Sequence, residues 1–410
     1  MRYVSLMLVT FLRPCRGGLV SRSALRPASS SASSVLRRTF VRSRTPAMAA
    51  AGGAASTAKS YMDTLAETDK DGRLVRSPSL FRNQISDEPD ARFKPATGRY
   101  HLYMSYGCPW ANRCLAALNL KRLRKAIGVS VVHPTWQLTS PETDEHKGWT
   151  FRDPSDPPLI PPSGYGSIAV DDLVPDTVNE AKTVRALYEL AAANEKKQGH
   201  GNGDAGKKFS VPVLWDKEEG VIVNNESEDI LRLFNSKFNE FSEPGPPTPD
   251  LYPQHLVDQI QEVNSWVYDH INNGVYKCGF AKSQKAYDEA IDALYVHLDK
   301  AEEILSKQRY LCGSTMTEAD IRLFMTLVRF DEVYAVYFKT NKKLISQYPN
   351  LLNYCRDLYQ TPGIGESINM DHIKKHYYTS HPVLNHYAIV PAGPNVIEDL
   401  KKPHNRAELS

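Results

Sequence analysis

The alternation of apolar and polar residues predicts two regions of different secondary structure. Short runs with a period of two residues predict strands at 99–105, 129–133, 210–216 and 221–225. Apolar residues at helical spacing predict helices from 109 to about 125, from about 178 to 194 and from 228 to 238. The pattern is helical from 253 to about 359, and the proline-bearing residues from 376 onward are expected to be extended. An α/β domain followed by an all-helical domain is the expected fold class.

One cysteine stands where a predicted strand meets a predicted helix, in Ser105-Tyr-Gly-Cys108-Pro109-Trp110-Ala111. Pro109 suits the first helical position, where no backbone N–H is required. Cys108 would then lie at a helix N-terminus, where free N–H groups and the helix dipole lower the pKa of a thiol. The arrangement is a thioredoxin-type signature and makes Cys108 the candidate nucleophile.

The motif is predicted to act with a single thiol. A dithiol motif places its second cysteine three residues on, where this chain has Ala111. Cys114 is six residues from Cys108, on a different face of the helix, and cannot easily bridge to it. The chemistry expected of a monothiol is exchange through a mixed disulfide that a second, soluble thiol resolves.

Two further segments indicate a site for a peptide-like ligand. Pro212, in Val211-Pro212-Val-Leu-Trp-Asp216, interrupts a strand-like run. In thioredoxin-like folds such a proline is cis and faces the cysteine, while an edge-strand proline is the alternative. Ser227 reads as a helix N-cap, and the pair Glu226-Ser227 would also suit the α-carboxylate and amine of a γ-glutamyl group.

The boundaries follow from these patterns. The segments are a transit-peptide-like leader (1–62), an N-terminal arm (63–98), a thioredoxin-like domain (99–241), a linker (242–252), a helical domain (253–375) and a tail (376–410). An insertion at 135–175, rich in Pro, Gly and Asp and containing Gly148-Trp149-Thr-Phe151, is predicted to form a lid over the site.

The leader is rich in Arg and Ser and has no Asp or Glu, a composition typical of a plastid or mitochondrial transit peptide. Its apolar run 4–12 leaves a secretory signal or two-step plastid targeting open, and Met48 would start a leaderless cytoplasmic form. Without the leader the chain holds 40 Lys and Arg against 47 Asp and Glu, a net charge of −7, which argues against nucleic-acid binding.

The composition also limits the cofactors and the cellular setting. Six cysteines without paired spacing, in a chain of 410 residues, favour a reduced compartment over a disulfide scaffold, and none lies at zinc-like spacing from histidine. We therefore expect no metal. No apolar run reaches the roughly 18 residues of a membrane span.

Taken together, the motifs resemble the xi class of glutathione transferases, the glutathionyl-hydroquinone reductases. The resemblance covers about residues 95–395. The motifs that carry it are Cys108-Pro-Trp-Ala111, Gly148-Trp-Thr-Phe151, Val211-Pro-Val-Leu-Trp-Asp216, Asn225-Glu-Ser227, Asn272-Asn-Gly-Val-Tyr276-Lys-Cys-Gly-Phe-Ala281, Thr317-Glu-Ala-Asp-Ile-Arg-Leu323, Val328-Arg-Phe-Asp331 with Tyr334, and His372-Ile-Lys-Lys-His376-Tyr377-Tyr378.

This resemblance implies a role for each site residue. Cys108 would be the nucleophile, Tyr276 the proton donor or acceptor, and Tyr334 and Tyr377 would lower the pKa of Cys108 by hydrogen bonding to its thiolate. Glutathione, the co-substrate, would contact Trp149, Lys208, Phe209, Ser210, Val211, Pro212, Glu226 and Ser227. The resemblance also implies a homodimer formed through the helical domain.

Two departures from the family pattern bear on these roles. Asn112 stands where relatives often have His, and Lys208 where Arg is expected, so the carboxylates of glutathione would be held without a guanidinium fork. Two other functions stay open at this stage. One is an omega-like thiol transferase or dehydroascorbate reductase, and the other is a ligand-binding protein that keeps the fold without turnover.

Overall fold

The computed structural model describes residues 67–409, which belong to one unit that runs from Ala58 to Ser410. The predicted leader, the start at Met48 and Cys15 lie outside the described residues.

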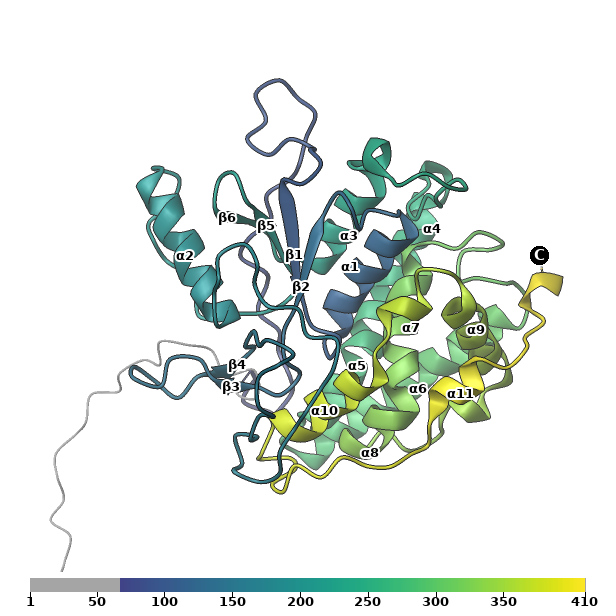
Figure 1. The fold of residues 1–410 in the computed structure, drawn as a ribbon. Helices are drawn as coiled ribbons and strands as arrows, with labels where there is room; N and C mark the ends of the chain where they lie inside the picture. Colours follow the sequence, from purple (N-terminus) through teal and green to yellow (C-terminus); the bar gives the residue numbers. More distant parts are fainter. Residues whose placement is uncertain (1–66, 410) are drawn as a thin grey trace, which may run out of the picture. The chain divides into compact units, whose positions relative to one another are not determined.

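A four-stranded sheet forms the centre of the first domain (Figure 1). Its strands are β1 (Tyr100–Met104), β2 (Gly128–Val131), β5 (Val213–Asp216) and β6 (Val221–Asn224), in the order β2-β1-β5-β6. β1 pairs with β2 in parallel and with β5 antiparallel, and β6 is antiparallel to β5. All five residues of β1 are buried, because helices cover both faces of the sheet.

Three helices cover this sheet. They are α1 (Pro109–Leu120), α2 (Val184–Lys197) and α3 (Ser227–Ser236). α1 packs on α3 on one face, and α2 lies on the opposite face (Figure 1). A short hairpin of β3 (Gln137–Leu138) and β4 (Lys147–Gly148) stands apart from the sheet. The thioredoxin-like expectation is confirmed, with Cys108 between β1 and α1.

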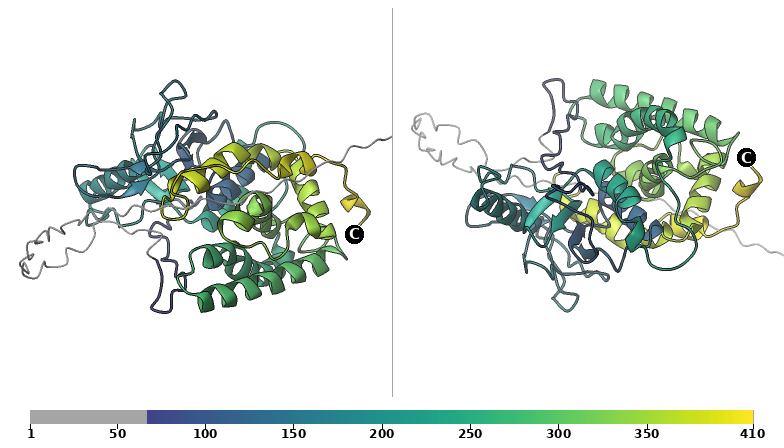
Figure 2. Two further views of the ribbon diagram at one scale, coloured as in Figure 1. Left: turned by 90° about the horizontal axis from the view of Figure 1, so that it is seen from below. Right: turned by 90° about the horizontal axis from the view of Figure 1, so that it is seen from above.

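The second domain is all helical (Figure 2). Its helices are α4 (Val257–Trp266), α5 (Gly274–Gly279), α6 (Gln284–Leu305), α7 (Glu318–Arg329), α8 (Ala335–Tyr337), α9 (Pro349–Gln360), α10 (Met370–Ser380) and α11 (Val396–Leu400), with π-helical turns η4 (Val267–Asn272) and η5 (Phe330–Tyr334). Thr317 and Asp320 form a capping box that starts α7.

The two domains meet where α1 packs against α7. Arg329, buried at the end of α7, donates to the backbone carbonyl of Tyr106 at 3.0 Å and to the side chain of Asn112. Asn112 in turn donates to the carbonyl of Ser367 at 2.8 Å. The side-chain oxygen and nitrogen of the asparagine that departs from the family pattern are therefore both hydrogen-bonded in the domain interface.

The third predicted helix of the first domain, 228–238, agrees with α3 to within two residues at each end, whereas the other two differ more from the observed helices. α1 ends at Leu120 because Arg122 adopts a positive φ of 52°. α2 begins at Val184, not near 178, because the Asp176 carboxylate accepts hydrogen bonds from the N–H groups of Val178 and Asn179, which form a turn instead.

The tail expected to be extended from 376 onward is partly helical. α10 starts after Asn369, which caps its N-terminus by accepting from the His372 N–H at 3.0 Å, and it continues to Ser380. α11 follows at Val396–Leu400. His376 and Tyr377 are therefore helical residues, fixed in direction by the same turn.

Within residues 67–409, no helix is long and apolar enough to cross a membrane. The same residues contain no cluster of three or more His, Cys, Asp or Glu side chains placed to hold a metal ion.

Candidate active site

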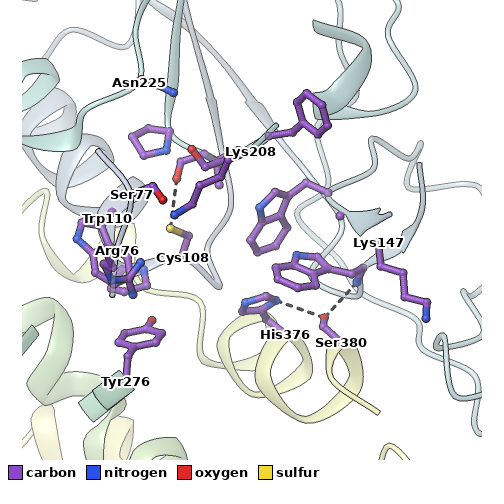
Figure 3. Close-up of a pocket in the computed structure, with 18 of the residues that line it drawn as sticks. Arg76, Ser77, Cys108, Trp110, Lys147, Lys208, Asn225, Tyr276, His376 and Ser380 are labelled. Carbon is purple, nitrogen blue, oxygen red and sulfur yellow. Dashed lines mark hydrogen bonds between the residues drawn. The ribbon is translucent and has the colours of Figure 1, made fainter. Parts of the chain in front are cut away.

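A cavity of about 470 Å³ lies at the carboxyl end of β1, where the arm, the thioredoxin-like domain and α5 and α10 meet (Figure 3). Eleven of the twelve residues predicted for the site line it: Cys108, Trp149, Lys208, Phe209, Ser210, Val211, Pro212, Glu226, Ser227, Tyr276 and Tyr377. Tyr334 is the exception. The segments that the sequence places far apart therefore converge on one concave site.

Cys108 is the residue that precedes the first turn of α1, and it is half-buried in the cavity wall. Its thiol donates to the carbonyl oxygen of Val211 at 3.4 Å, across the cis Val211–Pro212 peptide bond (Figure 3). The predicted cis proline beside the cysteine is confirmed. Cys108 and Cys114 are both free thiols. The Cys114 thiol is hydrogen-bonded to the carbonyl oxygens of Trp110 and Ser227.

The expected lowering of the Cys108 pKa is wrong for the site as it stands in this structure. Burial raises the pKa of the Cys108 thiol above its ordinary value. The N–H groups of Ala111 and Trp110, and the charges of Arg329 and Arg76, act in the opposite direction without reversing the shift. The helix N-terminus is present, but desolvation of the thiolate outweighs it.

This shift predicts the pH dependence of thiol reactivity. A raised pKa means that the thiolate forms only as the pH rises past the ordinary range of cysteine, near about 8.5. We expect the rate of alkylation of Cys108 by iodoacetamide in the unliganded protein to have its midpoint above that value, measured by mass spectrometry against pH. The Cys108→Ser variant supplies the background, and a midpoint below about pH 7 would restore the expectation from sequence.

The wall opposite the thiol has the groups expected to hold a tripeptide. Glu226, not Ser227, is the N-cap of α3, since Glu226 is extended and Ser227 already has helical geometry. The Glu226 carboxylate accepts from the Glu228 N–H at 3.3 Å, from the Ser227 hydroxyl at 3.3 Å and from the Ser79 hydroxyl at 2.9 Å. The Glu226 carboxylate is therefore held in a fixed position that suits a ligand amine. The N-terminus of α3 beside it suits a ligand carboxylate.

Lys208 is held by a partner that the sequence did not indicate. Its ammonium group pairs with Glu67 of the arm at 2.9 Å, and Glu67 is buried. Burial lowers the pKa of Lys208, while Glu67 acts against that shift. A carboxylate of glutathione at this position would share the lysine with Glu67.

An aromatic wall closes another side of the cavity. Trp149 stacks on the His376 ring at 4.5 Å between centroids, and Trp136 meets Trp149 edge-on at 5.6 Å. Trp136 and Trp149 come from the insertion predicted as a lid, and His376 from α10. The insertion thus contributes to the wall of the site, while its closure over a ligand stays a prediction.

Three tyrosine hydroxyls form a chain beside the cavity. Tyr276 and Tyr377 are 2.5 Å apart and Tyr377 and Tyr334 are 3.0 Å apart, measured between hydroxyl oxygens. Burial raises the pKa of all three, so each keeps its proton near neutral pH. Tyr276, 7 % exposed, and Tyr377 line the cavity, whereas Tyr334, 0 % exposed, lies behind Tyr377.

The predicted hydrogen bonds from Tyr334 and Tyr377 to the Cys108 sulfur are not formed. Among the described residues the thiol bonds to Val211, and the two hydroxyls bond within the tyrosine chain. The reason is geometric: the fully buried Tyr334 reaches Tyr377 and not the cavity. Tyr334 therefore contacts the cavity-lining hydroxyls from behind, through its hydrogen bond to Tyr377.

Some lining residues were missed from the sequence, and Arg76 matters most among them. It comes from the arm, in a stretch without a recognisable motif, and its guanidinium lies over the rings of Trp110 and Tyr276. Others are Ser77, Trp136, Lys147, Tyr268, Phe280, Ser380 and His381. His376 stood in a quoted family segment, which was the available signal.

Two family models match the chain, one for each domain. The glutathione S-transferase N-terminal domain matches residues 107–237, and the C-terminal domain matches residues 284–357. Both matches lie within the two domains that build the cavity.

Similar proteins identify the class. The chain is 42 % identical to the glutathionyl-hydroquinone reductase YqjG of Escherichia coli, over 82 % of this chain and 92 % of that protein. It is 40 % identical to the glutathionyl-hydroquinone reductase PcpF of Sphingobium chlorophenolicum, over 79 % and 90 %.

Solved structures agree with this. The xi-class glutathione transferase of Natrialba magadii superimposes with a TM-score of 0.69 at 44 % identity, over 80 % of this chain and 89 % of that one. The glutathione-bound structure of YqjG superimposes with a TM-score of 0.67 at 40 % identity, over 80 % of this chain and 96 % of that one. This chain, with its cysteine facing a cis proline and a tyrosine chain across one cavity, belongs to the xi class of glutathione transferases, the family of the glutathionyl-hydroquinone reductases.

Proposed function

We propose that this protein reduces glutathionyl-hydroquinones to hydroquinones at the expense of glutathione, which is oxidised to its disulfide. One observation carries the proposal: the Cys108 thiol and the paired hydroxyls of Tyr276 and Tyr377 line the same cavity. A nucleophile for sulfur and a proton donor for carbon are thus available to one bound molecule.

The first half-reaction transfers glutathione to the protein. The Cys108 thiolate attacks the sulfur of the conjugate, a sulfur–sulfur bond forms, and the bond between sulfur and the ring carbon breaks. The two sulfurs are oxidised to a disulfide, and the ring, already protonated at the sulfur-bearing carbon, takes up the electron pair of the breaking bond. The products are the free hydroquinone and a Cys108–glutathione mixed disulfide.

The ring carbon requires an acid, because a carbanion is a poor leaving group. Protonation of the sulfur-bearing carbon, with loss of the proton from the adjacent ring hydroxyl, converts the ring to its keto tautomer. Cleavage of the carbon–sulfur bond then releases the aromatic ring as a phenolate, which takes up a proton to give the hydroquinone. Tyr276 is the donor for this step, since its raised pKa keeps the hydroxyl protonated and Tyr377 supports it at 2.5 Å.

The second half-reaction regenerates the thiol. A glutathione thiolate attacks the glutathione sulfur of the mixed disulfide and displaces the Cys108 thiolate as oxidised glutathione leaves. Glu226 and Ser227 at the start of α3, and the backbone of Val211, would hold the glutathionyl group that is linked to Cys108, so that its sulfur is open to the incoming thiolate.

A comparison of two substrates tests the proposal. The leaderless protein is incubated with glutathione and either a glutathionyl-menadiol conjugate or a small glutathione mixed disulfide, and free hydroquinone and oxidised glutathione are measured by chromatography. We expect both substrates to turn over, the conjugate yielding one oxidised glutathione per hydroquinone. Reduction of the disulfide alone, or of dehydroascorbate, would favour the omega-like alternative, and no turnover would favour binding without catalysis.

Two further features extend the proposal beyond the described residues. The composition of residues 1–62 supports import into a plastid or mitochondrion, with a cytoplasmic form from Met48. Fusion of residues 1–62 to a fluorescent protein tests this, and diffuse fluorescence would contradict it.

The family resemblance supports a homodimer. Light scattering on the leaderless protein tests this, and a monomer mass would contradict it.

A further inference from the structure

Arg76 differs from the neighbouring arginines of the arm in having no carboxylate partner among the residues that the structure describes. Arg73 pairs with Glu289 at 2.9 Å, and Arg82 makes a bidentate pair with Asp229 at 2.7 and 2.8 Å. Within residues 67–409, by contrast, no hydrogen bond or ion pair is formed by Arg76, and its Nε is buried without a partner. A buried guanidinium nitrogen without an acceptor is costly, and because Arg76 lines the cavity, a bound ligand could supply that acceptor.

The position of Arg76 indicates which part of a ligand that acceptor belongs to. The guanidinium carbon lies 4.2 Å from the centroid of the Trp110 ring and 4.8 Å from that of Tyr276 (Figure 3). The positive charge also acts to lower the pKa of both Cys108 and Tyr276. Arg76 therefore lies beside Tyr276, the proposed proton donor, and within electrostatic reach of Cys108, the proposed nucleophile. This is the region in which the bond between the aromatic ring and the sulfur would break.

The reaction creates an anion at one atom of that ring. After protonation of the sulfur-bearing carbon, the ring holds a carbonyl at the adjacent carbon. When Cys108 attacks the sulfur, the electrons of the breaking carbon–sulfur bond restore the aromatic ring, and the negative charge moves to the carbonyl oxygen. A guanidinium beside this oxygen stabilises the charge as it develops, and its planar fork offers two N–H donors.

Resting on the proposed function, we infer that Arg76 is a catalytic residue that binds the ring oxygen next to the sulfur-bearing carbon and stabilises it as the oxyanion when the carbon–sulfur bond breaks. The substrate class follows: glutathione thioethers of aromatic rings that carry a free hydroxyl ortho to sulfur. A conjugate whose ortho hydroxyl is methylated cannot form the keto tautomer and would not be reduced.

The charged and titratable groups that face this position are Cys108 from the start of α1, Tyr276 from α5 and Lys208 from the loop before β5. Lys208 is occupied by Glu67. Arg76 is thus the arginine of the arm that is available to bind an anion on the ring. The N-terminus of α3 and Lys208 are assigned to the tripeptide.

The test compares Arg76→Met with Arg76→Lys and with Arg82→Met, which removes an arginine of the same arm outside the cavity. On the glutathionyl-menadiol conjugate we expect Arg76→Met to lower kcat about 100- to 1,000-fold, with partial recovery in Arg76→Lys. On a small glutathione mixed disulfide, which needs no oxyanion, kcat and the KM for glutathione should stay within about threefold of wild type, as in Arg82→Met.

A second readout separates charge stabilisation from folding. 4-Nitrophenol bound in the cavity reports its ionisation by absorbance, and its pKa should be lower on the wild-type protein than on Arg76→Met. Equal loss on both substrates, a raised KM for glutathione alone, or unchanged turnover of the conjugate would each overturn the assignment. If the wild-type protein itself fails to reduce the conjugate, the proposed function falls instead.

Discussion

Replacement of Cys108 by serine is expected to abolish reduction of glutathionyl-hydroquinones, with kcat falling on the order of 1,000-fold or more. A serine hydroxyl has too high a pKa to ionise at this position and cannot form a disulfide with the glutathione sulfur. The substitution leaves the cavity wall in place, because it only replaces the sulfur beside the Val211 carbonyl, a 3.4 Å contact, by a smaller oxygen. Steady-state turnover of the conjugate, with and without added glutathione, measures the effect.

The matched control is Cys312→Ser. Cys312 is buried, lies in the loop before α7 and bonds to the Thr317 side chain, which a serine hydroxyl can also do. We expect this variant to retain wild-type turnover. A comparable loss of turnover in the two variants would show that replacing any buried thiol has this effect. That result would contradict the role of Cys108 as the nucleophile.

The Tyr276→Phe variant is expected to separate the two kinds of substrate. Without the hydroxyl, the ring carbon loses its proton donor, so kcat on the glutathionyl-menadiol conjugate should fall about 100- to 10,000-fold. When Cys108 attacks a mixed disulfide, the leaving group is a thiolate and no carbon has to be protonated. Reduction of the mixed disulfide should therefore continue at near the wild-type rate. Parallel assays on the two substrates measure this divergence.

Tyr295→Phe serves as the control for this variant. Tyr295 is also buried, and its hydroxyl donates to the carbonyls of Thr340 and Lys343 away from the cavity. Both substitutions are expected to lower the free energy of unfolding by about 1 kcal/mol, measured by urea titration. Only Tyr276→Phe should lose activity on the conjugate, and an equal loss on the mixed disulfide would assign Tyr276 a structural role.

The sequence predicted the features that local residue chemistry determines. Pro109 fixes the start of α1 directly after Cys108, and the proline in Val211-Pro212 marks the cis bond that faces the thiol. Both depend on a few neighbouring residues, and so does the capping box at Thr317. For the same reason the two-domain plan could be recognised from periodicity, proline placement and the family motifs.

Features that depend on burial and on distant segments could not be predicted. The pKa of Cys108 is raised because the fold desolvates the thiol, which the helix N-terminus alone does not reveal. Tyr334 lies behind Tyr377 because of how η5 packs on α10. Arg76 and Glu67 enter the site from the arm, and only the path of the chain brings them to Tyr276 and Lys208.

The most direct test of the account is a single turnover without free glutathione. The leaderless protein in excess is mixed with the glutathionyl-menadiol conjugate, and released menadiol is counted while the protein is mapped by peptide mass spectrometry. The account predicts one equivalent of menadiol for each glutathione found in disulfide linkage on Cys108, removed by later addition of glutathione. Menadiol release with Cys108 unmodified, or glutathione on another cysteine, would contradict it.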